Sequence, residues 1–331
     1  MDIVTQGLLG AVAAQSGSNH RNVRVATVTG FLAAMLADAD VFIRSDADPL
    51  LVLEYHRHFS HSLIFIPFGA LIASLLLWPF LRRHLPWVQI YAYAFLGYAT
   101  AGILDACTSY GTRLLWPFSD ASIAWSIISV VDPVFSLILI VSLVLAWRLR
   151  NRRWAWAGLA LAVGYLLVGV AQHQRALAVA QGLAVERGLT PQRVLVKPTM
   201  ANLVLWRAIA VEGDKAYIDA VRVGPFTGSR IYAGTVVSIV DPDRWGDLPH
   251  GSVAHRELVR FHGYSDELLG VHPADPNFIG DLRYAMLPTG AAPLWGIALD
   301  PDRPEAPIAF EARRELNPEM RQLFVRMLRG E

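Results

Sequence analysis

The sequence predicts a mainly α-helical protein, in which a polytopic bundle of about five membrane-spanning helices precedes a smaller soluble α+β domain. Hydrophobic residues make up 54% of the 331 residues and charged residues only 17%, whereas soluble domains average roughly 25% charged residues. Residues 1–172 hold 20 of the 57 charged side chains and residues 173–331 hold 37. Long apolar stretches occur only in the first part. We therefore expect a transmembrane domain over 1–172 and a soluble extension over 173–331.

The composition excludes several classes of protein. A formal net charge of +1 leaves no basic surface for nucleic acid, so we expect no nucleic-acid partner. The single cysteine, Cys107, excludes an intrachain disulfide framework and a cysteine-rich zinc module. No reactive motif surrounds Cys107, and we expect it to be a packed small residue.

Five apolar stretches are candidates for membrane spans, which need about 20 residues each. The chain between Glu54 and Asp105 contains no acidic residue. Two of the five candidate stretches lie there. Asp132 is placed to cap another that begins with Pro133 at its first helical position, although that stretch is short for a full span. Residues 8–14 are too few to cross alone. The predicted spans are 25–43, 63–81, 87–104, 133–147 and 154–171.

The positive-inside rule predicts the orientation of the bundle. With the N-terminus in the cytoplasm, more arginines near the span ends face the cytoplasm than the opposite side. The cytoplasmic set is Arg21, Arg24, Arg82, Arg83, Arg148, Arg150, Arg152 and Arg153, and the opposite set is Arg44, Arg57, Arg113 and Arg175. We therefore expect an N-in, C-out protein whose C-terminal domain, in a bacterial cell, lies in the periplasm.

The second part combines helical and strand-like patterns. A polar connector over 172–188 is expected to be helical and to extend the last span. Runs of β-branched residues predict strands at 193–197, 203–211, 216–223 and 235–240, with a hairpin turn over 212–214. The chain closes on a predicted helix capped by Asn317, with Pro318 at its first position. The apolar face of this helix comprises Met320, Leu323, Phe324, Met327 and Leu328.

Ionisable residues near the membrane are candidates for function, because burying a charge at membrane depth costs about 2.5–3.5 kcal/mol on insertion scales. The predicted topology brings residues from four segments to the outer face, namely Asp38, Asp40, His56, His58, His61, Asp105 and Asp132. Imidazole and carboxylate are ligands of zinc and other divalent metals, which lower the pKa of a water to about 7 and polarise phosphoryl oxygens. This cluster without cysteine favours a hydrolytic metal site over a structural one.

The spacing leaves two ligand sets open. His56 and His61 are five residues apart, so they reach one metal only across a turn or a helix start. Glu54, His58 and His61 share one helical face and form a rival set. A site without metal also stands as an interpretation, since histidine before a span often lies among lipid head groups and aspartate often caps helices. The histidines without metal-ligand spacing, which we expect to be solvated, are His250, His255, His262 and His272.

Five motifs follow one another in the first part of the chain. They are MDIVTQGLLG at 1–10, ADAD at 37–40, HRHFSHS at 56–62, LDACTSYGT at 104–112 and LWPFSD at 115–120. Together they resemble the motifs of the bacterial membrane-bound metal-dependent hydrolases of the YdjM type, over about residues 1–170. The run GDLRYAMLP at 280–288 is similar to the C-terminal extension in a proteobacterial branch of that family.

The resemblance implies a hydrolase of the bacterial inner membrane that uses a divalent metal, with zinc as the first choice, because the family is grouped with zinc-dependent phospholipase C and the S1/P1-type nucleases. It implies a phosphoester substrate, which could be lipid-linked and keep its acyl part in the membrane lipid. The positions that match the polar family positions, and that it implies as metal ligands, are Asp38, Asp40, His56, His61 and Asp105. Two departures are Gln6, where the family often has histidine, and Ala101, where a Thr-His pair is usual.

One main hypothesis and one alternative follow. In the main hypothesis, a metal-activated water at the outer interface hydrolyses the phosphoester. Asp40 and His61 are catalytic, and Arg57 contacts the phosphate as a charge-assisted donor. The alternative is a decayed hydrolase or non-catalytic scaffold that presents 173–331 to an unidentified protein partner. Ala101 favours the alternative, because it removes an imidazole one helical turn from Asp105.

Overall fold

The chain divides into two compact units. The computed structural model describes residues 1–224 and 228–331. The first unit comprises Met1–Ile43, Tyr55–Ala171 and Met200–Asn202, and the second comprises Arg44–Glu54, Gln172–Thr199 and Leu203–Glu331. The second unit therefore includes a short segment from the N-terminal part of the sequence, which the sequence did not predict.

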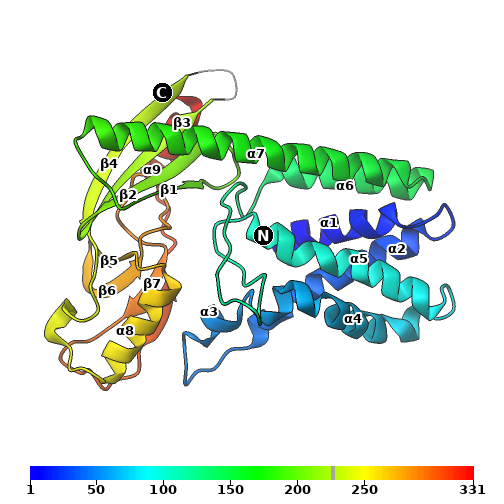
Figure 1. Ribbon diagram of the computed structural model, residues 1–331, viewed down its shortest axis with the longest axis horizontal. Coiled ribbons are helices and arrows are strands. Elements are labelled where there is room, and N and C mark those ends of the chain that lie inside the picture. The colour runs from blue at the N-terminus through cyan, green and yellow to red at the C-terminus, as the bar shows by residue number, and fades with distance from the viewer. Residues whose placement is uncertain (225–227) are drawn as a thin grey trace. The chain divides into compact units, whose positions relative to one another are not determined.

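The first unit is helical, and its helices run side by side in Figure 1. Their bounds are α1 Ile3–Ser16, α2 Val23–Leu36, α4 Ile66–Leu81, α5 Trp87–Ala106, α6 Pro133–Leu149 and α7 Arg153–Glu186, of which the last part of α7 belongs to the second unit. Within the described residues, three stretches are long and apolar enough to cross a membrane, namely Val23–Phe42, Leu63–Leu81 and Arg153–Glu186.

The predicted number of five spans is not confirmed. α6 is apolar but has only 17 residues, fewer than the roughly 20 that a span needs. α5 has 20 residues, but Gln89 and its tyrosines lower its mean hydropathy, and it is not among the three candidate stretches. α1, which contains the predicted short segment, has 14 residues.

Glycines allow three helices of the first unit to pack closely. Gly30 of α2 lies between Gly10 of α1 and Gly97 of α5. A Cβ atom on Gly30 would lie 2.4 Å from the carbonyl oxygen of Gly10, and one on Gly97 would lie 2.4 Å from the carbonyl oxygen of Gly30. Small residues allow such close approach of helix backbones in membrane proteins. α2 leads to Asp38 and α5 carries Asp105, so the glycines allow close packing of the helices that position these two carboxylates.

Asp132 caps α6, as predicted. Its carboxylate accepts hydrogen bonds from the backbone N–H groups of Val134 at 3.1 Å and Phe135 at 3.0 Å. The hydroxyl of Tyr165 donates to the same carboxylate at 2.9 Å. The described contacts of Asp132 are therefore with the first turn of α6 and with Tyr165, and none of them involves His61.

The described residues of the second unit form two four-stranded antiparallel sheets. The first has the order β1-β2-β3-β4, with β1 Arg193–Pro198, β2 Leu205–Glu212, β3 Lys215–Val223 and β4 Ser229–Ser238. The second has the order β5-β6-β7-β8, with β5 Leu269–His272, β6 Asp275–Asp281, β7 Trp295–Ala298 and β8 Ala309–Ala312. Because of these sheets, the prediction of a mainly α-helical chain is not confirmed for the protein as a whole.

The four predicted strands and their hairpin are confirmed. Each predicted range overlaps one strand of the first sheet, and no end is shifted by more than six residues. The hairpin pairs Glu212 with Lys215, and Gly213 in its turn has a φ of 60°. The second sheet was not predicted, because its strands are short and lie among glycine and proline residues, which weaken the alternating pattern.

The last part of α7 packs on the first sheet (Figure 1). Ala176 and Ala180 lie in one hydrophobic cluster with Trp206 and Val221 of the sheet. The prediction that the connector is helical and continues the last span is therefore confirmed. The close contact is possible because alanine side chains let the helix approach the strands.

Two further helices belong to the second unit, α8 Val253–Tyr264 and α9 Pro318–Arg329. The Asn317 side chain accepts a hydrogen bond from the backbone N–H of Met320 at 2.8 Å, which confirms the predicted cap of α9. Met327 on its apolar face is buried in one cluster with Leu205 and Ala220 of the first sheet.

The segment Arg44–Glu54, which leads into α3 (Leu51–Tyr55), belongs to the core of the second unit. Leu50 is fully buried in the hydrophobic cluster that includes α8 and the second sheet. Arg260 on α8 pairs with Asp48 at 3.1 Å and with Glu54 at 3.2 Å. The segment is therefore fixed both by burial and by charge.

Arg207 organises a loop of the second unit. It lies on β2, is only 4% exposed and donates hydrogen bonds to the carbonyl oxygens of Leu282 at 2.7 Å, Pro288 at 2.9 Å and Gly290 at 2.9 Å. A longer contact of 3.4 Å reaches the carbonyl oxygen of Leu287. One guanidinium thus contacts Leu282, Leu287 and Pro288 of the run 280–288, whose sequence resembles the family extension.

Candidate metal centre

One histidine and three aspartates from separate elements meet in the first unit. Asp38 and Asp40 lie on a 3-10 helix that continues α2, and Asp105 lies in the last turn of α5. His61 ends a short 3-10 helix that precedes α4. All four side chains are buried. The structure therefore brings these four residues, which are remote in sequence, into contact.

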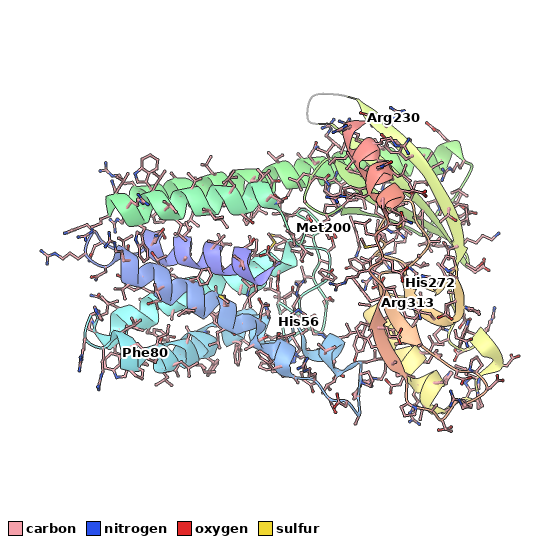
Figure 2. The ribbon with its side chains drawn as sticks, turned by 180° about the vertical axis from the view of Figure 1, so that it is seen from behind. His56, Phe80, Met200, Arg230, His272 and Arg313 are labelled. Atoms are coloured by element: carbon pink, nitrogen blue, oxygen red, sulfur yellow. The ribbon has the colours of Figure 1, made fainter. Side chains whose placement is uncertain are left out.

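The cluster lies at one end of the helices. Figure 2 shows His56 and Phe80 at opposite ends of the first unit. Phe80 lies in the last turn of α4, next to Arg82 and Arg83. The acidic cluster and this pair of arginines therefore occupy opposite ends of the bundle.

His61 is the centre of the cluster, and its side chain is fully buried. Its Nε2 atom lies 3.3 Å from Oδ1 of Asp38 and 3.2 Å from Oδ2 of Asp105, while Nδ1 lies 3.2 Å from Oδ2 of Asp40. Among the described residues, neither Nε2 of His61 nor Oδ2 of Asp105 has a hydrogen bond of good geometry. The two atoms are close together, but each is left without a hydrogen-bond partner within the described part of the chain.

Asp40 orients both predicted histidines. Its carboxylate accepts a hydrogen bond from the backbone N–H of Arg57 at 2.8 Å, contacts Nδ1 of His56 at 2.9 Å and accepts from the hydroxyl of Ser60 at 2.5 Å. It also contacts Nδ1 of His61. Metal-binding histidines usually donate one ring nitrogen to a carboxylate, which fixes the direction of the other. Asp40 therefore directs Nε2 of His61 toward Asp38 and Asp105.

Arg57 adds a buried positive charge beside Asp105. Its φ of 64° is uncommon for a residue other than glycine, and this left-handed turn points its backbone N–H at Asp40. The Nε atom lies 3.2 Å from Oδ2 of Asp105, and the guanidinium lies 5.0 Å from the ring centroid of Tyr110. The α-amino group of Met1 contacts the other oxygen of Asp105.

Burial and charge act in opposite directions on the pKa of His61. Burial favours the neutral imidazole, but the carboxylates of Asp105, Asp38 and Asp40 raise the pKa of His61 well above its ordinary value. The three carboxylates therefore stabilise the protonated form of this imidazole. The Arg57 guanidinium and the α-amino group of Met1, which both contact Asp105, add positive charge beside the carboxylates.

The donor atoms fit a divalent metal. One ligand atom from each of Asp38, His61 and Asp105 lies within 4.8 Å of the others, and the same holds for Asp38, Asp40 and His56. Imidazole and carboxylate together suit zinc and related ions. The first set contains the unsatisfied buried atoms Nε2 of His61, Oδ2 of Asp105 and Oδ2 of Asp38. It is therefore the better fit of the two, and Asp38 is common to both.

The rival set of Glu54, His58 and His61 is not brought together. Glu54 pairs with Arg260 and accepts a hydrogen bond from the hydroxyl of Tyr264, both in the second unit. The ring of His58 packs against the ring of Trp116, with 5.6 Å between centroids. Within the described part of the chain, the three residues form no common group of ligand atoms.

Ser60 and Tyr98 belong to the site but were not predicted. The Ser60 hydroxyl contacts Nδ1 of His61 at 3.0 Å as well as Asp40. The hydroxyl of Tyr98 donates to the backbone carbonyl of Ser60 at 2.8 Å. The position of Ser60 inside the HRHFSHS motif is a signal that could have identified it. Tyr98 gives no such signal, because it reads as one more aromatic residue of a span.

Ala101 and Gln6, the two departures from the pattern that the resemblance implies, both lie in well-packed surroundings. Ala101 is fully buried in an apolar cluster that includes Ala33 and Tyr98. Gln6 donates a hydrogen bond to the backbone carbonyl of Ala34 at 2.9 Å. Cys107 is buried in a hydrophobic cluster, as predicted. No imidazole therefore stands one turn before Asp105.

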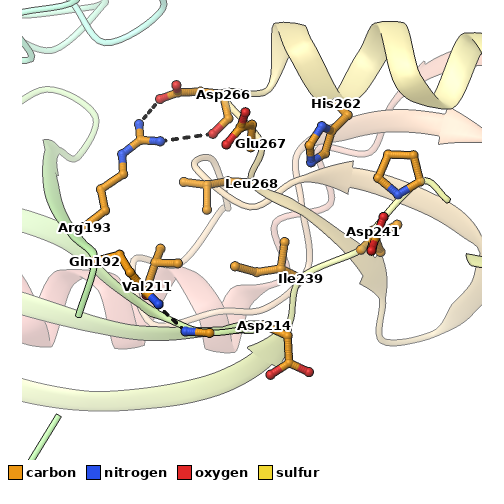
Figure 3. Close-up of a pocket in the computed structure, with 13 residues that line it drawn as sticks. Gln192, Arg193, Val211, Asp214, Ile239, Asp241, His262, Asp266, Glu267 and Leu268 are labelled. Atoms are coloured by element: carbon orange, nitrogen blue, oxygen red, sulfur yellow. Dashed lines mark hydrogen bonds and ion pairs between the residues drawn. The ribbon is translucent and has the colours of Figure 1, made fainter. Parts of the chain in front are cut away.

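A cavity of about 440 Å³ lies in the second unit (Figure 3). It is lined mostly by acidic and apolar residues, and Arg193 at its edge pairs with Asp266. None of the predicted metal ligands lines it. The cavity therefore shares no residue with the cluster around His61.

Comparison with known families assigns the part of the chain that carries this cluster. The family described as YdjM inner membrane protein matches residues 1–176, which is more than half of the chain. The protein belongs to the YdjM family. The matched range includes every residue of the cluster around His61, so the cluster is part of the YdjM region. No curated protein and no solved structure matches the chain.

Proposed function

We propose that this YdjM protein is an inner-membrane hydrolase that depends on a divalent metal, with zinc as the first choice, and acts on a phosphoester. The environment of His61 supports this most strongly. Asp40 holds one ring nitrogen, and the other faces the carboxylates of Asp38 and Asp105. Zinc-binding histidines use their two nitrogens in this way.

The residues have separate roles in this proposal. Asp38, His61 and Asp105 would hold the metal, and Asp40 and His56 complete a second set that shares Asp38. A divalent ion bound there lowers the pKa of a water to about 7 and polarises a phosphoryl oxygen. Asp40 keeps His61 in its orientation, and Ser60 keeps Asp40 in place.

Arg57 would neutralise the phosphate. Its guanidinium is buried beside Asp105, so a phosphate that reached the metal ligands would meet it at short range. Planar guanidinium groups bind phosphate oxygens through charge-assisted hydrogen bonds. The left-handed backbone of Arg57 ties this side chain to Asp40, and thus to the same cluster.

The position of the ligands along the candidate spans supports a lipid or lipid-linked phosphoester as the substrate class. Asp38 and Asp40 lie near the end of the candidate span Val23–Phe42, and His61 lies two residues before the candidate span Leu63–Leu81. A lipid or lipid-linked phosphoester presents its phosphate at that depth while its acyl chains stay in the bilayer. Since the Arg82–Arg83 pair lies at the other end of the helices, the positive-inside rule supports a periplasmic site and a periplasmic second unit.

Metal binding and hydrolysis test the proposal in the full-length protein in detergent. We expect Asp38→Asn and His61→Gln to lose one zinc per chain relative to wild type, measured by elemental analysis. We expect phosphate release from p-nitrophenyl phosphate or from phosphatidic-acid vesicles to fall by at least about 10–100-fold, the range seen when metal-site residues are altered.

The matched control is His84→Gln, which changes an exposed histidine of the first unit and should leave zinc content and phosphate release unchanged. Circular dichroism shows whether each variant remains folded. Equal zinc content in wild type, Asp38→Asn and His61→Gln would contradict the proposal.

A scaffold without catalysis is the second candidate, and two observations favour it. Ala101 leaves no imidazole one turn before Asp105. Arg57 and the α-amino group of Met1 already pair with Asp105 without any metal. In this case the YdjM region would serve to hold the second unit at the membrane for a protein partner.

The Ala101→His variant separates the two candidates. If the site has decayed, the wild type binds no zinc at the cluster, and the new imidazole should give one bound zinc per chain. The control is Ala94→His, which introduces the same bulk at a buried position two turns earlier on α5. A gain of zinc by both variants, or by neither, would remove the support for a decayed site.

A further inference from the structure

We infer that the second unit carries its own binding site for a divalent first-row metal, formed by Asp243, His250 and His255. One ligand atom from each of these residues lies within 4.8 Å of the others. The inference is independent of the cluster around His61, which belongs to the first unit. The sequence spacing gave no indication of this site, because the three residues come from a loop and the start of α8.

The distances between the donor atoms suit a shared metal ion. Nε2 of His255 lies 3.1 Å from Oδ1 of Asp243, and Nδ1 of His250 lies 3.9 Å from the same oxygen. Zinc bonds to nitrogen and oxygen are about 2.0–2.1 Å long, so ligands of a tetrahedral ion are about 3.3 Å apart. The rings of His250 and His255 meet edge to face, with 4.9 Å between centroids. Small side-chain rotations are therefore enough to bring the three donors onto one ion.

The backbone around two of the ligands is fixed. The N–H of Asp243 donates to Oδ1 of Asp241 at 3.1 Å, which makes a tight turn. The N–H of His255 donates to the hydroxyl of Ser252, the cap of α8, at 3.3 Å. A fixed backbone reduces the entropy that is lost when a metal binds.

The loop that carries Asp243 and His250 is also anchored by its apolar residues. Trp245 packs against the core of the second unit, and Leu248 is buried within it. These two residues lie between Asp243 and His250 in the chain. The ligands are therefore held close to α8 by the core, not only by each other.

Exposure of the three ligands differs in a way that suits binding from solution. The His255 side chain is 12% exposed, so the expectation that it is solvated is wrong, whereas His250 and Asp243 are 77% and 68% exposed. A partly buried imidazole with two exposed partners gives an ion an entry path and leaves a coordination position open. The donor set of two imidazoles and one carboxylate selects zinc and similar ions over calcium or magnesium. Binding would clip the loop 241–250 to α8.

Zinc titration of the full-length protein tests this site. The background is Asp38→Asn combined with His61→Gln, which removes two ligands of the first-unit cluster. In that background we expect one zinc per chain by isothermal titration calorimetry and a higher melting temperature when zinc is added. His250→Ala and Asp243→Asn, which change exposed side chains, should weaken zinc binding at least about ten-fold and abolish the thermal shift.

The matched control is His262→Ala, which removes another histidine of α8 that is outside the set. It should bind zinc like its parent. Zinc binding that is unchanged by His250→Ala and Asp243→Asn, or no zinc binding in the Asp38→Asn and His61→Gln background, would overturn the inference. Failure of the first-unit site is distinguished from this, because it would leave zinc binding in that background intact and equal to wild type.

Discussion

Replacement of Arg207 by leucine is expected to lower the melting temperature of the second unit by on the order of 10 °C. The guanidinium is buried and donates to the backbone carbonyls of Leu282, Pro288 and Gly290. Leucine leaves these carbonyls without their donor, and an unsatisfied buried polar group costs about 1–3 kcal/mol. One kcal/mol corresponds to about 2–4 °C for a domain of this size.

The measurement is thermal unfolding of the detergent-solubilised protein followed by tryptophan fluorescence, because Trp206 lies in this unit and is fully buried. Arg207→Lys keeps the charge but has one nitrogen instead of a planar fork, so its melting temperature should fall between those of leucine and wild type. Arg321→Leu at an exposed position of α9 is the control and should be neutral. A melting temperature of Arg207→Leu equal to that of Arg321→Leu would show that the carbonyl contacts contribute little.

Replacement of Gly30 by alanine is expected to destabilise the first unit and to weaken metal binding at the cluster around His61. The added Cβ would lie 2.4 Å from both the carbonyl oxygen of Gly10 and the Cβ of Ala14, so α1 and α2 must separate. Overpacking of this kind costs about 1–3 kcal/mol. The intrinsic gain from alanine in a helix is only about 0.5–1 kcal/mol, so the clash determines the sign.

The effect should extend from the glycine to the site. Gly30 lies eight residues before Asp38, and Gly97 lies eight residues before Asp105, which corresponds to about 12 Å along each helix. Moving α2 relative to its neighbours therefore changes how Asp38 and Asp105 approach His61. Zinc affinity measured by titration should fall together with the melting temperature.

Gly164→Ala is the matched control, because this glycine lies within α7 and has open space around the added Cβ. It should leave the melting temperature unchanged or raise it slightly, in line with the intrinsic preference of alanine for helices. Equal behaviour of Gly30→Ala and Gly164→Ala would mean that the helices tolerate a wider separation than the structure shows.

Much of the fold could be predicted from local patterns. The caps at Asp132 and Asn317 and the strands of the first sheet depend on residues close together in sequence, and the structure contains all of them. The second sheet and the placement of Arg44–Glu54 depend on partners that are distant in sequence. A local sequence pattern does not identify such distant partners. In addition, glycine and proline within the short strands weaken the alternating pattern that would indicate a strand.

The site was predictable to the extent that chain direction determines it. Helices that alternate in direction bring the ends of α2 and α5 and the start of α4 to one face, so the meeting of Asp38, His61 and Asp105 follows from topology. The roles within the site do not follow from it. The left-handed backbone of Arg57 and the contacts of Asp40 depend on side-chain geometry that spacing cannot predict. For the same reason, the grouping of Asp243 with two histidines was not foreseen.

The placement of Arg44–Glu54 limits how the protein can be divided into fragments for experiments. Leu50, Asp48 and Glu54 complete the hydrophobic and charged contacts of α8, yet they are encoded well ahead of the extension. A recombinant fragment that starts at residue 173 would lack these residues. The apolar side chains of α8 that pack against Leu50 would then be exposed to solvent. The extension is thus not a portable module, and a chimera that exchanges it between relatives must also transfer the loop ahead of the second candidate span.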